Sequence, residues 1–137
     1  IPMLVTHKVV ASTPKTTSVV SFSLLQDGRT LVALERPTVL ATRVSFFLDQ
    51  SNLAFMYGAI HGYLTNGVRT FYSETVDLSI IPNGTAVLVG FDMYTPYRQK
   101  VTAYLSEVEL VLIAKGILTY LKEGPGQGLD FPMEMQL

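Results

Sequence analysis

Residues 76–91 read VDLSIIPNGTAVLVGF, an alternating apolar run, a tight-turn dipeptide and a second apolar run. Val76, Leu78 and Ile80 fall on one side of a strand and the polar residues between them on the other, because successive side chains of a strand point to opposite faces. Asn83-Gly84 is favoured in hairpin turns, since both residues accept positive φ at low cost. This stretch predicts an antiparallel hairpin with one buried face.

Similar patterns lie on both sides of this hairpin. Asp27-Gly28 and Asn66-Gly67 are two further hairpin-turn dipeptides, and the segments between turns are rich in Val, Thr, Phe, Tyr and Ile, which suit a pleated surface. We therefore expect eight strands, at Met3–Ala11, Ser18–Leu25, Thr30–Glu35, Val39–Asp49, Ala54–Leu64, Val68–Ile81, Thr85–Tyr94 and Lys100–Ala114. No internal repeat is evident in the sequence, and its length suits one domain.

Two segments also carry helical signals. Apolar residues at helical spacing make residues 101–122 an alternative amphipathic helix, and they are Val101, Leu105, Val108 and Leu112. The β-branched residues and the alternation Glu107-Val108-Glu109 favour a strand over 101–114. A short helical turn over Ser51–Phe55, with Ser51 as its N-cap, is the second alternative.

The fold class that we expect is all-β. Eight to nine strands joined by short turns favour a single-domain antiparallel β-sandwich of jelly-roll type. The predicted organisation is a sandwich over residues 1–123, a Gly/Pro hinge at 124–128 and an extended C-terminal arm strand at 129–137. Its core should contain twelve apolar side chains, those of Val20, Phe22, Leu24, Val44, Phe46, Leu48, Val76, Leu78, Ile80, Val87, Val89 and Phe91.

Composition points to a protein that covers part of its surface with a partner. Hydrophobic residues make up 48% of the chain and charged residues only 15%, against about 25% charged in an average domain. The mean hydropathy is +0.33. Because a soluble monomer needs a charged coat, we expect a homo-oligomer. The chain begins at Ile1 without a preceding Met, so we interpret it as a processed product or an excised domain.

Several functional classes are disfavoured by what the sequence lacks. The net charge is −1 with scattered Lys and Arg, so no nucleic-acid contact is expected, and no apolar run approaches the roughly 18 residues of a transmembrane helix. Cysteine is absent, and His7 and His61 are the only imidazoles. No Gly-x-Ser-x-Gly or phosphate-loop motif occurs. We therefore expect no enzyme, no catalytic residues, no metal and no cofactor.

The C-terminal nine residues alternate apolar and polar side chains and follow the Gly124–Gly128 hinge. Such a strand buries one face either on its own sheet or on a neighbouring molecule's sheet. We predict that this arm is exchanged between subunits. Its buried face would hold Leu129, Phe131, Met133, Met135 and Leu137.

An aromatic stripe is the second candidate site. If residues 55–64 form a strand, four side chains share one face with Ala59, and they are Phe55, Tyr57, His61 and Tyr63. We interpret the stripe as core or subunit interface, with a ligand platform as the alternative. Carbohydrate platforms rely heavily on Trp, and this chain has none.

The sequence therefore favours a structural self-assembly subunit. We expect a capsid, shell or filament protein, or its projecting domain, that associates through β-sheet surfaces and terminal arms in a virion or an extracellular assembly. This expectation rests on low charge, high apolarity and the arm, and its link to viral coats is an analogy of fold. The alternative is a non-catalytic binding module for a glycan or a protein ligand.

Overall fold

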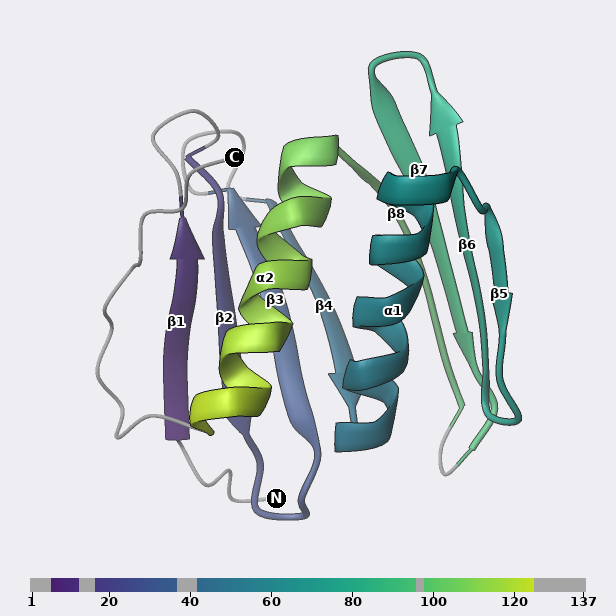
Figure 1. Cartoon of the computed structure of the whole chain (residues 1–137). Coiled ribbons are helices and arrows are strands. Elements are labelled where there is room, and N and C mark those ends of the chain that lie inside the picture. Colours follow the sequence, from purple (N-terminus) through teal and green to yellow (C-terminus); the bar gives the residue numbers. More distant parts are fainter. Residues whose placement is uncertain (1–5, 13–16, 37–41, 96–97, 125–137) are drawn as a thin grey trace.

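The computed structural model describes residues 6–12, 17–36, 42–95 and 98–124 (Figure 1). This part of the chain is mostly β, with two four-stranded antiparallel sheets and two helices. The first sheet contains β1 (Thr6–Ser12), β2 (Val19–Leu24), β3 (Thr30–Arg36) and β4 (Thr42–Leu48). The second contains β5 (Thr70–Tyr72), β6 (Val76–Asn83), β7 (Ala86–Met93) and β8 (Gln99–Leu105). The helices are α1 (Gln50–Asn66) and α2 (Glu107–Glu123).

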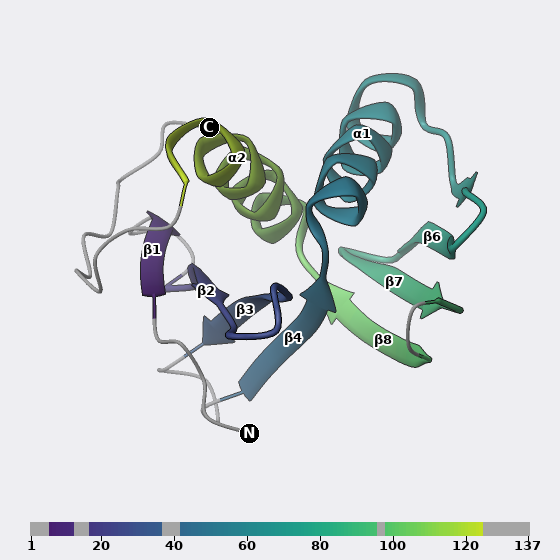
Figure 2. The ribbon, with the colours of Figure 1, turned by 90° about the horizontal axis from the view of Figure 1, so that it is seen from below.

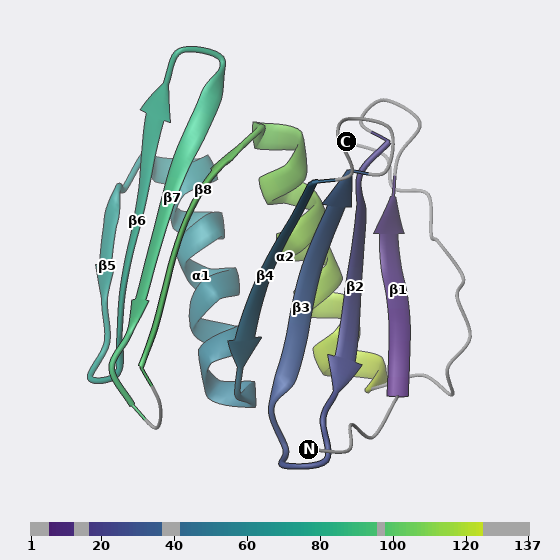
Figure 3. The same ribbon diagram turned by 180° about the vertical axis from the view of Figure 1, so that it is seen from behind.

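Four strands followed by one helix occur twice along the chain, a repeat that was not evident in the sequence. The two units exchange their helices, because α1 follows β4 but packs on β6, whereas α2 follows β8 but packs on β1 and β2. The helices also pack against each other. Figures 1 and 3 show both helices on one side of the sheets, and Figure 2 shows β4 and β8 meeting at their edges.

The prediction of a strand over Ala54–Leu64 was wrong, because these residues lie in α1. Asp49 is the N-cap and its carboxylate accepts a 2.8 Å hydrogen bond from the Asn52 amide, so Ser51 is not the cap. The buried side chains recur at helical spacing, and they are Asn52, Leu53, Met56, Ala59, Ile60 and Tyr63. Burial at a period of 3.6 residues therefore outweighed the alternating pattern that the sequence also contained.

The prediction of one strand over Lys100–Ala114 was also wrong. Strand β8 ends at Leu105, and α2 begins at Glu107. The Ser106 side chain accepts a hydrogen bond from the Glu109 amide, and the Glu109 carboxylate accepts one from the Ser106 amide. This capping box explains why the Glu107-Val108-Glu109 alternation starts a helix instead of continuing a strand.

The Asn66-Gly67 dipeptide ends a helix and is not a hairpin turn. Gly67 adopts a left-handed conformation with φ of 69°, and its amide donates to the Tyr63 carbonyl. The predicted strand Val68–Ile81 is divided into β5 and β6 by a turn in which Ser73 binds the backbone of Val76. The hairpins at Asp27-Gly28 and Asn83-Gly84 are confirmed, since they join β2 to β3 and β6 to β7.

The core is the part of the fold that the sequence predicted best. Ten of the twelve expected core residues are buried, and the other two, Leu24 and Val44, are partly buried. The helices add a layer over them, with Phe22 stacked on Tyr120 at a ring-centroid distance of 4.8 Å. Each sheet joins strands that are neighbours in the chain, so the described strands do not show the Greek-key order of a jelly roll.

Candidate functional site

The second sheet has one face that no described helix covers. Alternation along its strands buries Val76, Leu78 and Ile80 toward the helices and turns the residues between them outward. We call this outward side of β5–β8 the open face. It combines a hollow, charged groups and exposed apolar side chains.

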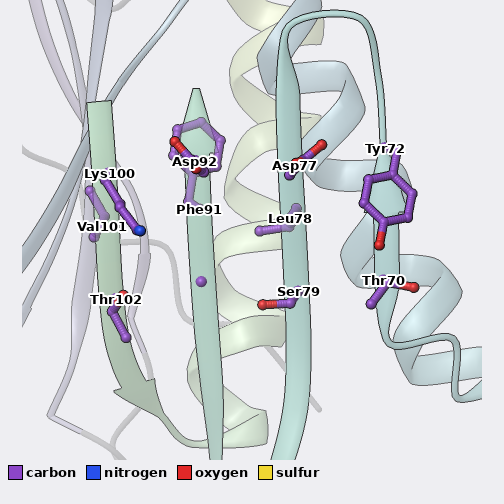
Figure 4. A pocket seen from close by; sticks show the side chains of 11 residues that line it. Thr70, Tyr72, Asp77, Leu78, Ser79, Phe91, Asp92, Lys100, Val101 and Thr102 are labelled. Carbon is purple, nitrogen blue, oxygen red and sulfur yellow. The ribbon is translucent and has the colours of Figure 1, made fainter. Parts of the chain in front are cut away.

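Strand register arranges the open face in rows. Two polar rows cross all four strands, and they are Tyr72–Asp77–Asp92–Lys100 and Thr70–Ser79–Gly90–Thr102. Figure 4 shows their side chains at two successive levels of the sheet. A third row crosses the next level of β6, β7 and β8, and we call Ile81, Leu88 and Tyr104 the apolar row.

A shallow hollow of about 270 Å³ lies over the two polar rows, and we call it the polar depression. Its floor is at Gly90, where an added Cβ atom would stand 2.8 Å from the Ser79 hydroxyl oxygen. Glycine weakens a strand interior and often marks a place where a ligand or another backbone approaches closely. The missing side chain at Gly90 therefore leaves room for the Ser79 hydroxyl at the floor of the polar depression.

Opposite charges meet at one end of the polar depression. Asp77 and Asp92 are register partners on β6 and β7. Repulsion between like charges makes such a pair unfavourable. The Tyr94 hydroxyl donates a hydrogen bond to Asp77, and this bond is the main reason that the pKa of Tyr94 rises to about 12. Arg98 lies 3.5 Å from Asp92 Oδ1 and covers the Tyr94 ring. These neighbours offset the repulsion between the two carboxylates.

The buried Asp92 Oδ1 atom has no hydrogen-bond partner among the described residues, although Arg98 is within ion-pair distance. Buried carboxylate oxygens are normally hydrogen-bonded, because the charged form is costly to remove from water. The Arg98 contact supplies charge compensation without a directed bond. This oxygen is the most poorly satisfied polar atom at the polar depression.

A second charged cluster lies away from the open face and joins the two repeats. Arg36 on β3 donates to both Glu109 carboxylate oxygens at 2.6 and 2.7 Å, and Ser18 donates to the same carboxylate at 2.7 Å. Burial opposes ionisation of Glu109, but the hydrogen bonds from Arg36, Ser106 and Ser18 outweigh it and lower its pKa. Both oxygens of the Glu109 carboxylate accept hydrogen bonds that hold α2 to the first sheet. We therefore assign Glu109 a structural role.

The aromatic stripe predicted from the sequence does not form. Phe55, Tyr57, His61 and Tyr63 lie on a helix, so alternate residues point in different directions. Tyr63 is buried and His61 is exposed, while the Tyr57 and His61 rings, one helical turn apart, have centroids 6.1 Å apart. The prediction of a shared face was therefore wrong.

The other sequence-predicted site is the C-terminal arm, and it lies outside the described residues. Its five apolar residues are Leu129, Phe131, Met133, Met135 and Leu137. Conversely, the polar depression was not predicted from the sequence. The alternating polar positions Asp77 and Ser79 were visible, but the pairing that places Gly90 beside them requires the strand register.

The described residues contain no group of three or more His, Asp or Glu side chains arranged to hold a metal ion. Neither α1 nor α2 is long and apolar enough to cross a bilayer. No protein-family model matches this chain, and no curated protein is significantly similar to it.

Proposed function

We propose that this protein is a non-catalytic structural subunit that self-assembles, and that the apolar row on the open face is one of its contact surfaces. The proposed setting is a capsid, shell or filament, or a domain projecting from one. One observation carries the proposal. Of the six large hydrophobic residues that are exposed in the described chain, five lie on or beside the second sheet, and they are Val68, Tyr72, Ile81, Tyr94 and Tyr104.

The concentration of apolar groups favours a contact with another protein surface. Contiguous exposed apolar patches are uncommon on soluble monomers, whereas single exposed residues are normal. Burying an apolar side chain of this size is worth about 1.5–3 kcal/mol when it is complete. Ile81 and Tyr104 retain 40% and 57% exposure, so their removal from water would contribute part of that amount in each copy.

A second copy of the chain is the proposed occupant. Open sheet faces pack on each other at about 10 Å, with side chains interdigitating between them. A sheet-to-sheet contact of the kind expected from the sequence would then arise between subunits, at the apolar rows of two copies. The C-terminal arm at 129–137 is the second proposed contact, by exchange between neighbours.

The test compares a double serine variant in the apolar row with a single serine variant of an exposed residue on α1. Ile81→Ser combined with Tyr104→Ser should lower the oligomeric mass, measured by size-exclusion chromatography with light scattering. Leu64→Ser is the matched control, because Leu64 is 39% exposed but lies on α1. A wild-type chain that is monomeric at every concentration would overturn the assembly proposal, and an unchanged mass in the double variant would exclude the apolar row.

Deleting residues 125–137 tests the arm separately. If arm exchange joins the subunits, the truncated chain should dissociate while its circular dichroism spectrum and thermal transition persist. If the truncated chain keeps its oligomeric mass, the arm does not join the subunits.

The alternative function, a binding module for a glycan or a protein ligand, is favoured by the polar depression.

A further inference from the structure

We infer that the polar depression binds a neutral, hydroxyl-rich ligand, with one saccharide ring as the unit that it accommodates. The ligand would lie over Gly90 with the Tyr72 ring at its side. This inference does not rest on self-assembly, because the residues that line the polar depression are different from the apolar row.

The floor of the polar depression carries no side chain of its own at Gly90. Gly90 occupies a central strand, with β6 and β8 on either side, where a residue with a side chain would strengthen the sheet. Its register partners Ser79 and Thr102 flank it, and Ser79 Oγ lies 2.8 Å from the position that a Cβ atom would take. Gly90 therefore leaves room for the Ser79 hydroxyl at the floor, where a ligand can bind it.

Hydroxyl and carboxylate groups surround the floor of the polar depression. Thr70, Ser79 and Thr102 each offer a hydroxyl, which both donates and accepts a hydrogen bond. Asp77 and Asp92 add acceptors at the neighbouring level, and Lys100 adds a donor. The hydroxyls of a saccharide have the same dual capacity, so adjacent ring hydroxyls can pair with a carboxylate and a serine or threonine together.

The balance of charges at the polar depression disfavours a charged ligand. Asp77 and Asp92 are offset by Lys100, the register partner of Asp92 on β8, and by Arg98, which lies 3.5 Å from Asp92 Oδ1 but does not line the polar depression. An anionic ligand would meet two carboxylates, and a cationic ligand would meet Lys100. A neutral ligand avoids both penalties and still gains charge-assisted hydrogen bonds.

The position of Tyr72 and the volume of the polar depression both suit a single ring. Tyr72 is 71% exposed on the edge strand β5, so its ring can cover one side of a bound molecule. Tyrosine provides an apolar ring face together with a polar hydroxyl. The volume of about 270 Å³ is just below the about 300–1,000 Å³ of drug-sized ligand pockets. This volume suits a single ring unit better than a long chain.

The experiment titrates the full chain, labelled with ¹⁵N, with glucose, galactose, mannose and N-acetylglucosamine, and follows its amide resonances. Sugar concentrations of up to about 50 mM detect dissociation constants in the millimolar range. At least one sugar should shift the amides of Ser79, Gly90 and Thr102 in a saturable way. Glucuronate, glucosamine and a single-stranded oligonucleotide serve as charged probes. Saturable binding of a charged probe but of no neutral sugar would overturn the inference.

Two matched pairs of variants test the geometry. Gly90→Ala fills the floor and should weaken binding at least about tenfold, whereas Gly58→Ala, on an exposed position of α1 with open space around it, should leave binding unchanged. Tyr72→Ala should weaken binding, and Tyr104→Ala, another exposed tyrosine on the open face but in the apolar row, should not.

The outcomes separate this inference from the proposed assembly. Chromatography with light scattering on the same variants reports the oligomeric mass, and thermal denaturation confirms that each variant is folded. No saturable shift with any of the four neutral sugars overturns saccharide binding, whatever the oligomeric mass. Sugar binding to a protein that is always monomeric would support the inference and overturn self-assembly.

Discussion

The side-chain amide of Gln99 on β8 binds the backbone of Phe47 on β4 as a neighbouring strand would. Gln99 Oε1 accepts from the Phe47 amide at 2.8 Å, and Gln99 Nε2 donates to the Phe47 carbonyl at 2.8 Å. Strands β4 and β8 are edges of two different sheets, and one glutamine therefore links the β8 edge to both backbone groups of Phe47 at the β4 edge.

This link predicts the effect of removing the amide. Gln99→Leu should lower the free energy of unfolding by about 1–3 kcal/mol, because two hydrogen bonds of about 0.5–1.5 kcal/mol each are lost. The Phe47 amide should also exchange faster with solvent in hydrogen-exchange measurements. Gln26→Leu, at an exposed turn, is the control. Unchanged exchange at Phe47 would show that Gln99 does not protect the β4 edge.

The Arg36–Glu109 pair predicts a larger loss. Glu109→Ala leaves the guanidinium of Arg36 without its carboxylate, and breaking a fully buried pair costs about 3–5 kcal/mol. Because the Arg36 side chain keeps 22% exposure, we expect about 2–4 kcal/mol in urea denaturation. Glu107→Ala is the matched control, since Glu107 is exposed in the same helical turn. Equal effects of the two substitutions would contradict the assigned role of Glu109.

The lowered pKa of Glu109 predicts a dependence of stability on pH. Because folding lowers this pKa below its ordinary value of 4.5, the folded state binds fewer protons there than the unfolded state. The stabilisation is complete above pH 4.5 and is lost as the pH falls through the folded pKa. The melting temperature should therefore decrease below pH 4.5, and Glu109→Gln should make this decrease shallower. A parallel decrease in both proteins would assign acid sensitivity to other groups.

One glycine inside α1 and one at its C-terminal cap should respond in opposite ways to substitution by alanine. Gly58 lies in the helix interior with open space around it, so Gly58→Ala should stabilise the protein by about 0.5–1 kcal/mol. Gly67 has φ of 69° at the C-terminal cap, so Gly67→Ala should destabilise it by about 1–2 kcal/mol. Thermal denaturation of the two variants shows whether each substitution raises or lowers the stability of the protein. A stabilising Gly67→Ala would argue against a left-handed cap.

Local sequence was sufficient to predict the structure where the alternation of apolar residues and the turn dipeptides indicated the same elements. The strands around Asp27-Gly28 and Asn83-Gly84 formed as expected, because alternation and hairpin dipeptides indicated the same structure. Local sequence was misleading in residues 50–66, where Phe55, Tyr57 and Tyr63 alternate but Leu53, Met56 and Ile60 have helical spacing. Both patterns are present there, and the helix signals that flank them, the N-cap Asp49 and the C-cap Gly67, were interpreted as parts of strands and turns.

The amino-acid sequence by itself determined a β-rich chain, two of its hairpins and most of the core, because these depend on residues that are close in sequence. Tertiary structure alone decided that α1 packs on the second sheet and α2 on the first, since each helix had two apolar sheet faces available. It also decided the open face, because Asp77, Gly90 and Lys100 become neighbours only through strand pairing across turns. Long-range register, which no local pattern specifies, therefore created the candidate site.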